Sequence, residues 1–369
     1  MKEWAEVAGA VSATSRTSQK TAVLAEYLRG LDDAALPVAV TFLVGRPFAE
    51  RDQRTVGIGW AAIAGVVEDL VDAPAGALGA AYNRSSDLGQ AVGDLLADEG
   101  HAPSGKPPSL TEAADAFAAI AASRGAAAKA KVLRELLARS DPATARALVK
   151  VLSGDLRIGL RAGHLEAAIA AAFDVPLADV QWAGMLTGDL GQVALLARRR
   201  ALDEAQMAVF RPLKVMLASP VADEAEVLRR LGAPVWVEDK YDGIRAQLHK
   251  QGREVRLYSR DLNEVTSGYP EVVAAAAREK WDGILDGELL GWRDGTALPF
   301  LALQTRLGRK QPPVELLEQV PVIFVAFDVL ALRSGRGRKV EPLLRVALRE
   351  RRARLDALGL TERPGFGVS

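Results

Sequence analysis

The sequence predicts two domains of different fold class: an all-α half, residues 1–213, followed by an α+β half with an antiparallel sheet, residues 214–369. Three observations predict this. The chain has 369 residues, too many for one ordinary hydrophobic core. Alanine and leucine recur at helical spacing as far as Leu213. After Arg211-Pro212 the pattern changes from helical periodicity to alternation of apolar and polar residues, as in half-buried strands.

The first half carries helical periodicity and helix-start signals. The segment Lys129–Leu137 puts its valine and leucines on one face. Asp141-Pro142 is typical of a helix start, with aspartate as N-cap and proline at the first helical position, so a helix is predicted over Ala143–Leu152. Earlier, a loop rich in proline and glycine connects two helices, and Ser109 or Thr111 is expected to cap the second of them.

The second half is predicted to alternate strands with a few helices. Gln251-Gly252 marks a hairpin turn, and Gly287 interrupts one strand, which suggests a bulge or a close backbone approach. The basic, glycine-rich segment Arg333–Lys339 is best interpreted as a solvated loop. Helices are expected over Pro270–Lys280 and Arg345–Leu358. The predicted strands are Val235–Lys240, Ile244–Gln251, Glu254–Tyr258, Ile284–Leu290 and Val322–Val329.

Composition excludes some chemistries. The chain has no cysteine, which excludes disulfides and cysteine-based zinc sites. Three histidines lie far apart, so a histidine metal cluster is not expected. The formal net charge is zero, which neither supports nor forbids nucleic-acid binding, since only the surface that faces phosphates must be positive. No signal peptide and no apolar run of membrane-spanning length is seen, so we expect a soluble cytoplasmic protein.

The residues with the clearest chemistry form the segment Glu238-Asp-Lys240-Tyr-Asp242-Gly243-Ile-Arg245. A lysine at the end of an alternating strand, followed by Asp-Gly, is expected at the mouth of a site rather than in a core. Lysine attacks phosphorus only as the neutral amine, so its pKa must be lowered by burial or by nearby positive charge. Arg245 is suited to hold phosphate or ribose oxygens in a fork. The alternative interpretation is a surface lysine before a turn, because K-x-D-G is a short pattern.

Four segments in this order resemble the nucleotidyltransferase superfamily of DNA ligases, RNA ligases and capping enzymes. The lysine segment is similar to its first motif. Further along follow Tyr258-Ser-Arg260-Asp, Asp286-Gly-Glu288-Leu and Ala326-Phe327-Asp. The resemblance implies that Lys240 is the catalytic residue that carries the nucleoside monophosphate.

The resemblance also assigns roles at the nucleotide. Arg260 would contact the nucleotide or a 5′-phosphate, and Glu288 would approach the ribose and help with metal. Phe327 would stack on adenine, although core packing is the ordinary reason for a phenylalanine in a strand. Glu238, on the same side of the predicted strand as Lys240, is expected to accept from the adenine amino group.

Other segments resemble ATP-dependent DNA ligases of bacterial and archaeal type. One runs from Leu298 to Lys310, after the third motif. Gly45–Phe48 and Arg211–Ala218 are similar to family segments, the latter with Lys214-Val215 in place of the usual Gln-Pro. The segment 154–161 brackets a short apolar turn with glycines and arginines, which suits phosphate contact, although a tight turn with incidental charges explains it equally well. With the resemblance, Gly154, Arg157, Gly159 and Arg161 are expected to bind DNA.

The resemblance implies ATP and Mg²⁺ as cofactors and nicked duplex DNA as the partner. It also implies a monomer that is associated with the nucleoid when it is bound to DNA. NAD-dependent ligases need a cysteine-rich zinc module that this chain cannot build. Full-length members continue with an E-G-x-x-x-K motif and an OB-fold domain; neither is found, so the nucleotidyltransferase domain is expected to be incomplete. Two functions remain open: a DNA ligase acting through Lys240, or a catalytically degenerate ligase-like protein that binds DNA or nucleotide. An RNA-ligase or capping activity is a weaker rival, because the first half is helical.

Overall fold

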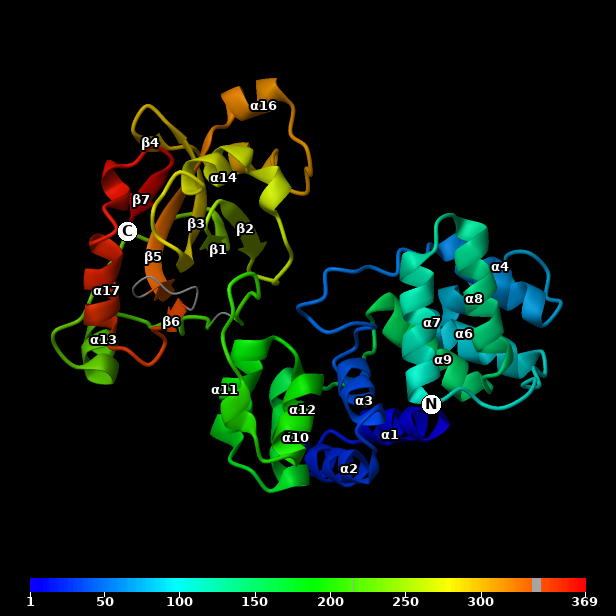
Figure 1. Ribbon diagram of the computed structural model, residues 1–369. Coiled ribbons are helices and arrows are strands. Elements are labelled where there is room, and N and C mark those ends of the chain that lie inside the picture. The colour runs from blue at the N-terminus through cyan, green and yellow to red at the C-terminus, as the bar shows by residue number, and fades with distance from the viewer. Residues whose placement is uncertain (215, 334–339) are drawn as a thin grey trace. The chain divides into compact units, whose positions relative to one another are not determined.

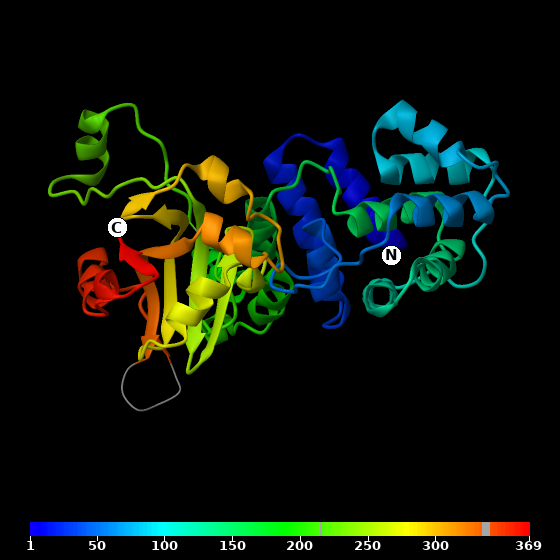
Figure 2. The ribbon, with the colours of Figure 1, turned by 90° about the horizontal axis from the view of Figure 1, so that it is seen from above.

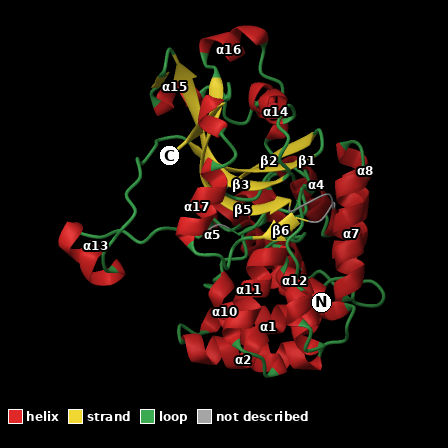
Figure 3. Ribbon diagram, turned by 60° about the vertical axis from the view of Figure 1, so that its left-hand side comes forward, coloured by secondary structure: helices red, strands yellow, loops and turns green. Residues whose placement is uncertain are grey.

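The computed structural model describes residues 1–214, 216–333 and 340–369. The basic loop expected at Arg333–Lys339 therefore lies, apart from its first residue, outside the described residues. The chain divides into two units, Met1–Gln206 and Met207–Ser369. Strands occur only in the second unit of the described chain (Figure 3), which agrees with the predicted change from all-α to α+β.

The first unit consists of helices joined by loops (Figure 1). They are α1 Lys2–Ala13, α2 Thr17–Gly30, α3 Ala35–Leu43, α4 Trp60–Leu70, α5 Ala77–Ser85, α6 Leu88–Asp98, α7 Leu110–Ala122, α8 Ala126–Ala138, α9 Pro142–Ser153, α10 Ala162–Phe173, α11 Leu177–Thr187 and α12 Leu190–Arg198, with a 3-10 turn at Leu202–Glu204.

Aromatic side chains join the helices of the first unit. The Trp4 ring on α1 meets the Phe42 ring on α3 edge-on, with 6.1 Å between centroids, and Phe42 lies 5.4 Å from Phe117 on α7. All three are fully buried. The indole N–H of Trp4 donates to the carbonyl of Ala39 at 3.1 Å, so burial leaves no polar atom of that ring unpaired.

The helix-start signals are confirmed. Asp141 caps α9, its carboxylate accepting from the Thr144 N–H at 2.9 Å, with Pro142 at the first position. Ser109, rather than Thr111, caps α7 by accepting a hydrogen bond from the Glu112 N–H. The Glu112 carboxylate in turn accepts from the Ser109 N–H, which completes a capping box. Among the described residues, no helix is long and apolar enough to cross a membrane.

The second unit is built on one sheet. Its strand order is β2-β1-β3-β5-β6, with antiparallel neighbours; β4 pairs with β3, and β7 runs parallel to β5. Figure 2 shows α17 beside the part of the sheet that β5 and β7 form. The elements are α13 Glu224–Leu231, β1 Ile244–Gln251, β2 Glu254–Ser259, a 3-10 turn Thr266–Gly268, α14 Pro270–Ala276, β3 Gly283–Arg293, β4 Thr296–Ala297, α15 Phe300–Gln304, α16 Val314–Gln319, β5 Val322–Arg333, β6 Val340–Pro342, α17 Leu348–Asp356, a 3-10 turn Leu360–Glu362 and β7 Phe366–Val368.

One face of the sheet carries the apolar core. The opposite face, called the polar face, carries charged and polar side chains together with buried apolar ones such as Leu290. Leu248, Leu285 and Phe324 lie on the core face, where α14 and α17 add Val272 and Leu355. Because successive side chains of a strand alternate between faces, the residues between these lie on the polar face.

A short segment before the sheet is bonded to side chains of the polar face. The Phe210 N–H donates to Nδ1 of His249 at 3.0 Å, and the Tyr258 hydroxyl donates to the Phe210 carbonyl. Gln247 accepts from the Leu213 N–H at 2.9 Å and donates to its carbonyl at 2.6 Å. Burial lowers the pKa of His249 to about 3, so its ring is neutral and can accept at Nδ1. Residues 210–213 thus belong to the second unit.

The interruption predicted at Gly287 is confirmed. The β3–β5 register shifts between Asp286 and Gly287. A Cβ at Gly287 would lie 2.4 Å from the Val325 carbonyl oxygen and 2.6 Å from the Phe324 ring. Only glycine allows this approach.

The strand predicted over Val235–Lys240 is wrong. The segment has no regular secondary structure and joins no ladder among the described residues. Trp236 is 53% exposed and Val237 84% exposed, although they would occupy opposite faces of a strand. Neither face is therefore buried, and alternation alone supplies no hydrogen-bonding partner. The expectation that Glu238 and Lys240 share one side of a strand loses its basis.

Candidate active site

The lysine segment enters the sheet at a point where only glycine fits. Gly243 directly precedes β1, and a Cβ there would lie 2.5 Å from the Leu289 carbonyl oxygen and 2.8 Å from Cγ of Glu288. The Asp-Gly pair after Lys240 is therefore explained by close approach of the backbone to β3. This approach brings Lys240 near enough to Glu288 for its charge to act on that carboxylate.

Arg245 is the centre of the polar cluster. It lies opposite Glu288 in the β1–β3 register. Its fork binds Asp286, with Nε–Oδ1 at 3.2 Å and Nη2–Oδ2 at 2.7 Å, and Nη1 donates to the Met216 carbonyl at 3.0 Å. The guanidinium carbon lies 5.4 Å from the centroid of the Phe327 ring. Each of the three guanidinium nitrogens thus already donates one hydrogen bond within the protein.

Burial controls the two acids of β3. It raises the pKa of Asp286, while the ion pair with Arg245 opposes that rise. Burial raises the pKa of Glu288 from 4.5 to about 7, although the charges of Arg245 and Lys240 pull it down. A carboxyl group that titrates near neutral pH beside a lysine and an arginine is typical of a functional site.

The next strand brings an aromatic ring and a third acid to the cluster. Phe327 on β5 is partly exposed, which leaves part of its ring available for a flat ligand. Asp328, opposite Asp286 in the register, forms a two-point ion pair with Arg351 of α17, with both distances 2.8 Å. From the sequence, Asp286 was quoted as part of a motif without a role, and Arg351 was not named.

Lys240 and Glu238 are both exposed. Glu238 forms an ion pair with Arg352 of α17 at 3.1 Å, so one carboxylate oxygen is engaged by the protein. Arg260 lies in an exposed turn directly after β2, and β1 separates that strand from β3. The structure therefore gathers Arg245, Glu288 and Phe327, places Lys240 beside them, and leaves Arg260 at the neighbouring edge.

The loop expected to meet DNA lies between α9 and α10. Gly154, Arg157 and Gly159 all adopt positive φ. The Nζ atom of Lys20, on α2, donates hydrogen bonds to the carbonyls of residues 158 and 159 at 2.8 and 2.9 Å and so stabilises the loop. Arg157 is paired with Asp155 and donates to the Ser86 carbonyl. Arg161 is exposed.

Two segments that the sequence singled out meet at this loop. A Cβ on Gly45 would lie 3.2 Å from that of Leu156. The chain around Gly45–Phe48 therefore packs against the 154–161 loop.

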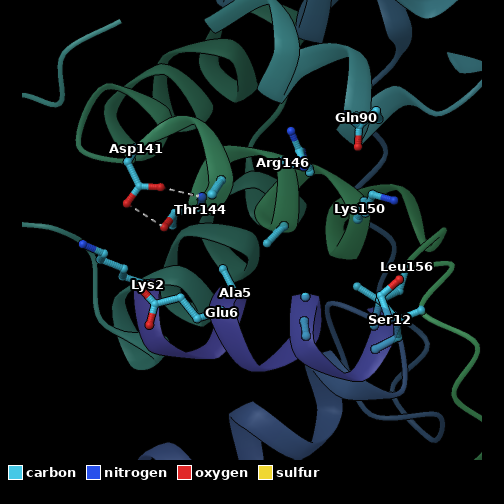
Figure 4. A pocket seen from close by; sticks show the side chains of 15 residues that line it. Lys2, Ala5, Glu6, Ser12, Gln90, Asp141, Thr144, Arg146, Lys150 and Leu156 are labelled. Atoms are coloured by element: carbon cyan, nitrogen blue, oxygen red, sulfur yellow. Dashed lines mark hydrogen bonds between the residues drawn. The ribbon is translucent and has the colours of Figure 1, made fainter. Parts of the chain in front are cut away.

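The first unit also contains a pocket of about 480 Å³ between α1 and α9 (Figure 4). Two of its cations are paired, Lys150 with Asp87 at 2.5 Å and Arg146 with Asp94 at 3.2 Å. The lining also includes Lys2 and Glu6 beside small residues such as Ala5. The carboxyl group with the raised pKa and the aromatic ring beside Arg245 lie in the second unit, where we place the candidate site.

A metal site made only of protein side chains is not found. Among the described residues, no group of three His, Asp or Glu side chains could hold an ion. Magnesium in nucleotide sites is commonly held by one or two carboxylates together with phosphate oxygens. Glu288, whose carboxyl group faces Lys240 and Arg245, fits such a role.

Comparisons with known proteins agree with the resemblance. Residues 215–365 match the family model "ATP dependent DNA ligase domain", and residues 1–170 match "DNA ligase N terminus". A probable DNA ligase of Opitutus terrae is 39% identical over 416 residues, covering 95% of this chain and 40% of that protein. A probable DNA ligase of Koribacter versatilis is 39% identical over 358 residues, covering 97% of this chain and 61% of that protein. The chain thus spans less than two thirds of the length of these relatives.

Among solved structures, the ligase domain of M. tuberculosis LigD is 28% identical, with a TM-score of 0.28, over 36% of this chain and 38% of that chain. This score is too low to bear on the fold.

Proposed function

The chain belongs to the ATP-dependent DNA ligase family, and from this premise we propose that it seals nicks in duplex DNA through AMP carried on Lys240. The observation that carries the proposal is the neighbourhood of Lys240. Its charge acts on Glu288, beside Arg245 and the partly exposed ring of Phe327. In this proposal a nucleophile, an acceptor for ribose and a platform for a base act together where the start of β1 meets the middle of β3.

The first step is attack by the neutral Lys240 amine on the α-phosphorus of ATP. The N–P bond forms, the amine gives up one proton to solvent, the bond from the α-phosphorus to the bridging oxygen breaks, and pyrophosphate leaves. Phe327 stacks on adenine, Glu288 accepts from a ribose hydroxyl, and Arg260 contacts phosphate. Glu288 is the protein carboxylate suited to hold Mg²⁺, which when bound would supply charge that screens the phosphates. AMP then passes to the 5′-phosphate of the nick, and the 3′-hydroxyl displaces it.

In this proposal two of the assigned contacts are constrained by ion pairs that already exist within the protein. Arg245 can meet a nucleotide only through donors not held by Asp286, or after that pair opens. Glu238 has one oxygen bound by Arg352, and its second oxygen remains for the adenine amino group.

The test of the first step is covalent labelling with ATP labelled at the α-phosphate. The wild type is expected to retain label on a denaturing gel, and Lys240→Ala is expected to lose it. Lys280→Ala, which removes an exposed lysine of the same unit, is the matched control and should label normally. Absence of label on the wild type, or label that survives Lys240→Ala, refutes the proposal.

The contacts proposed for DNA lie in the first unit. Arg157 and Arg161 would bind backbone phosphates through the 154–161 loop, where Gly154 and Gly159 let the backbone come close. Replacing both arginines by alanine is expected to weaken binding to nicked duplex. The slope of the logarithm of the binding constant against the logarithm of the salt concentration should become less steep by about one to two. Arg124→Ala, an exposed arginine in another loop of this unit, should leave the slope unchanged.

A second candidate is a ligase-like protein that binds DNA or nucleotide without turnover. The engagement of Arg245 by Asp286 and of Glu238 by Arg352 favours it, because groups assigned to the nucleotide are occupied within the fold. It predicts salt-dependent DNA binding that Lys240→Ala does not change, together with no covalent label. Sealing of a nick that depends on Lys240 would exclude this candidate.

A further inference from the structure

Helix α17 connects both sides of the candidate nucleotide site. Arg351 holds Asp328 at two points, directly after Phe327 on β5. The next residue, Arg352, reaches the lysine segment instead, with Nη1 donating to Oε1 of Glu238 at 3.1 Å. One turn of helix is therefore bonded to the neighbour of the aromatic ring and to the residue two positions before Lys240.

The contact made by Arg352 is more than a surface ion pair. Its side chain is only 15% exposed, although it belongs to a highly charged helix. The guanidinium carbon lies 5.4 Å from the centroid of the Trp236 ring, and Nε donates to Asp356 on the same helix at 2.9 Å. Asp356 thus orients the guanidinium while Trp236 and Glu238 hold it. Pairs of this kind are stronger than isolated exposed pairs because the arginine is already immobilised.

The chain from residue 236 to residue 242 has few other attachments. Val237 is 84% exposed, so apolar burial contributes little to the position of this stretch. Residues 236–242 join no strand ladder in the described chain. Downstream this stretch is fixed at Gly243, where the backbone packs on β3. Its upstream fixed point is the contact with Arg352.

We propose that Arg352 is a positioning residue for Lys240. It fixes the segment two residues before the lysine, and through the same helix it sets that segment relative to Phe327. By binding Oε1 of Glu238 it also orients Oε2 toward the ligand. Arg352 does not touch the nucleotide. The inference rests on the proposed function, because it concerns the placement of the amine that carries AMP.

Loss of this contact is expected to slow transfer to Lys240 even when nucleotide is saturating. A freed segment places the amine correctly for a smaller fraction of the time, and the rate of labelling should fall on the order of tenfold in Arg352→Ala. Arg352→Lys keeps the charge but loses the planar fork and should recover only part of the rate. Trp236→Ala removes the stacking from an exposed position, which avoids disturbing the core, and should slow labelling about threefold.

The matched control is Arg349→Ala, which removes an exposed arginine from the same helix. It should label like the wild type. A rate for Arg352→Ala equal to that of Arg349→Ala would overturn the proposal. A faster rate would also overturn it, since the contact would then restrain the segment in an unproductive position.

Limited digestion with trypsin supplies a measurement independent of activity. Cleavage after Lys240 is expected to be faster in Arg352→Ala than in the wild type, because a segment that is no longer held adapts more readily to the protease. If the wild type accepts no label, the proposed function fails, but proteolysis still reports on the anchoring. Equal cleavage rates after Lys240 in Arg352→Ala and Arg349→Ala would show that Arg352 does not hold the segment.

Discussion

Replacing Glu288 by glutamine is expected to stabilise the second unit at alkaline pH while impairing the site. Burial raises the pKa of this carboxyl group from 4.5 to about 7. The folded state therefore favours the protonated form, and the stability that this provides is lost as pH rises from 4.5 through 7. Each pKa unit corresponds to about 1.4 kcal/mol, so the full shift would amount to about 3 kcal/mol. Partial exposure reduces this, and we expect about 2 kcal/mol.

Native-state hydrogen exchange of β1 and β3 amides measures this effect, because it reports opening of the second unit alone. Corrected for intrinsic rates, the opening free energies of wild type and Glu288→Gln should be similar near pH 5 and should differ by about 2 kcal/mol near pH 8.5, with the variant more stable. Asp286 has a raised pKa in both proteins, so its contribution cancels in the comparison. A variant that is less stable than the wild type near pH 8.5 would refute the reasoning.

Three further substitutions test the packing. Gly287→Ala should destabilise the second unit by about 2–3 kcal/mol in urea unfolding, because the added carbon meets the facing carbonyl of β5 at 2.4 Å. Gly291→Ala on the same strand meets only side chains, at 3.2 Å or more, and should cost less; equal costs would contradict the clash. Arg306→Met should destabilise by about 3 kcal/mol, since it leaves Glu271 and two buried carbonyls without their donor, and a neutral result would show that this pair contributes nothing. Asp141→Ala should cost about 1 kcal/mol through loss of the α9 cap, with Asp141→Asn close to wild type; an equal loss in both would point to charge rather than capping.

The features predicted correctly from the sequence are those that local patterns determine. Asp141-Pro142 specifies a helix start because a capping carboxylate and a fixed φ act within a few residues. The strand predicted over Ile244–Gln251 has the same bounds as β1. Helix ends were less accurate: the helix expected over Pro270–Lys280 ends at Ala276, and the one expected over Arg345–Leu358 spans Leu348–Asp356. Frayed last turns carry no strong local signal.

Local patterns did not predict which strands or charged residues pair when they are far apart in the sequence. Val235–Lys240 alternates as well as β1 does, but alternation says which residues share a face and not whether a neighbouring strand exists. Arg245 pairs with Asp286 across 41 residues, and Arg352 with Glu238 across 114. A single sequence contains charges of both signs at many such separations. Only the register of the sheet and the packing of α17 select these partners.

The arrangement of the three acids explains why the perturbed pKa falls on Glu288. Asp286 and Asp328 lie opposite each other in the β3–β5 register, and each has a two-point arginine partner. Glu288 lies opposite Arg245, whose fork is already directed at Asp286, so it receives only a longer-range share of that charge. The fold therefore gives Asp286 and Asp328 an arginine partner each, and leaves Glu288 partly buried without a guanidinium group bound to it. A group held in this way costs stability, and the cost is compensated if a ligand, such as a ribose hydroxyl or a phosphate-bound cation, satisfies it.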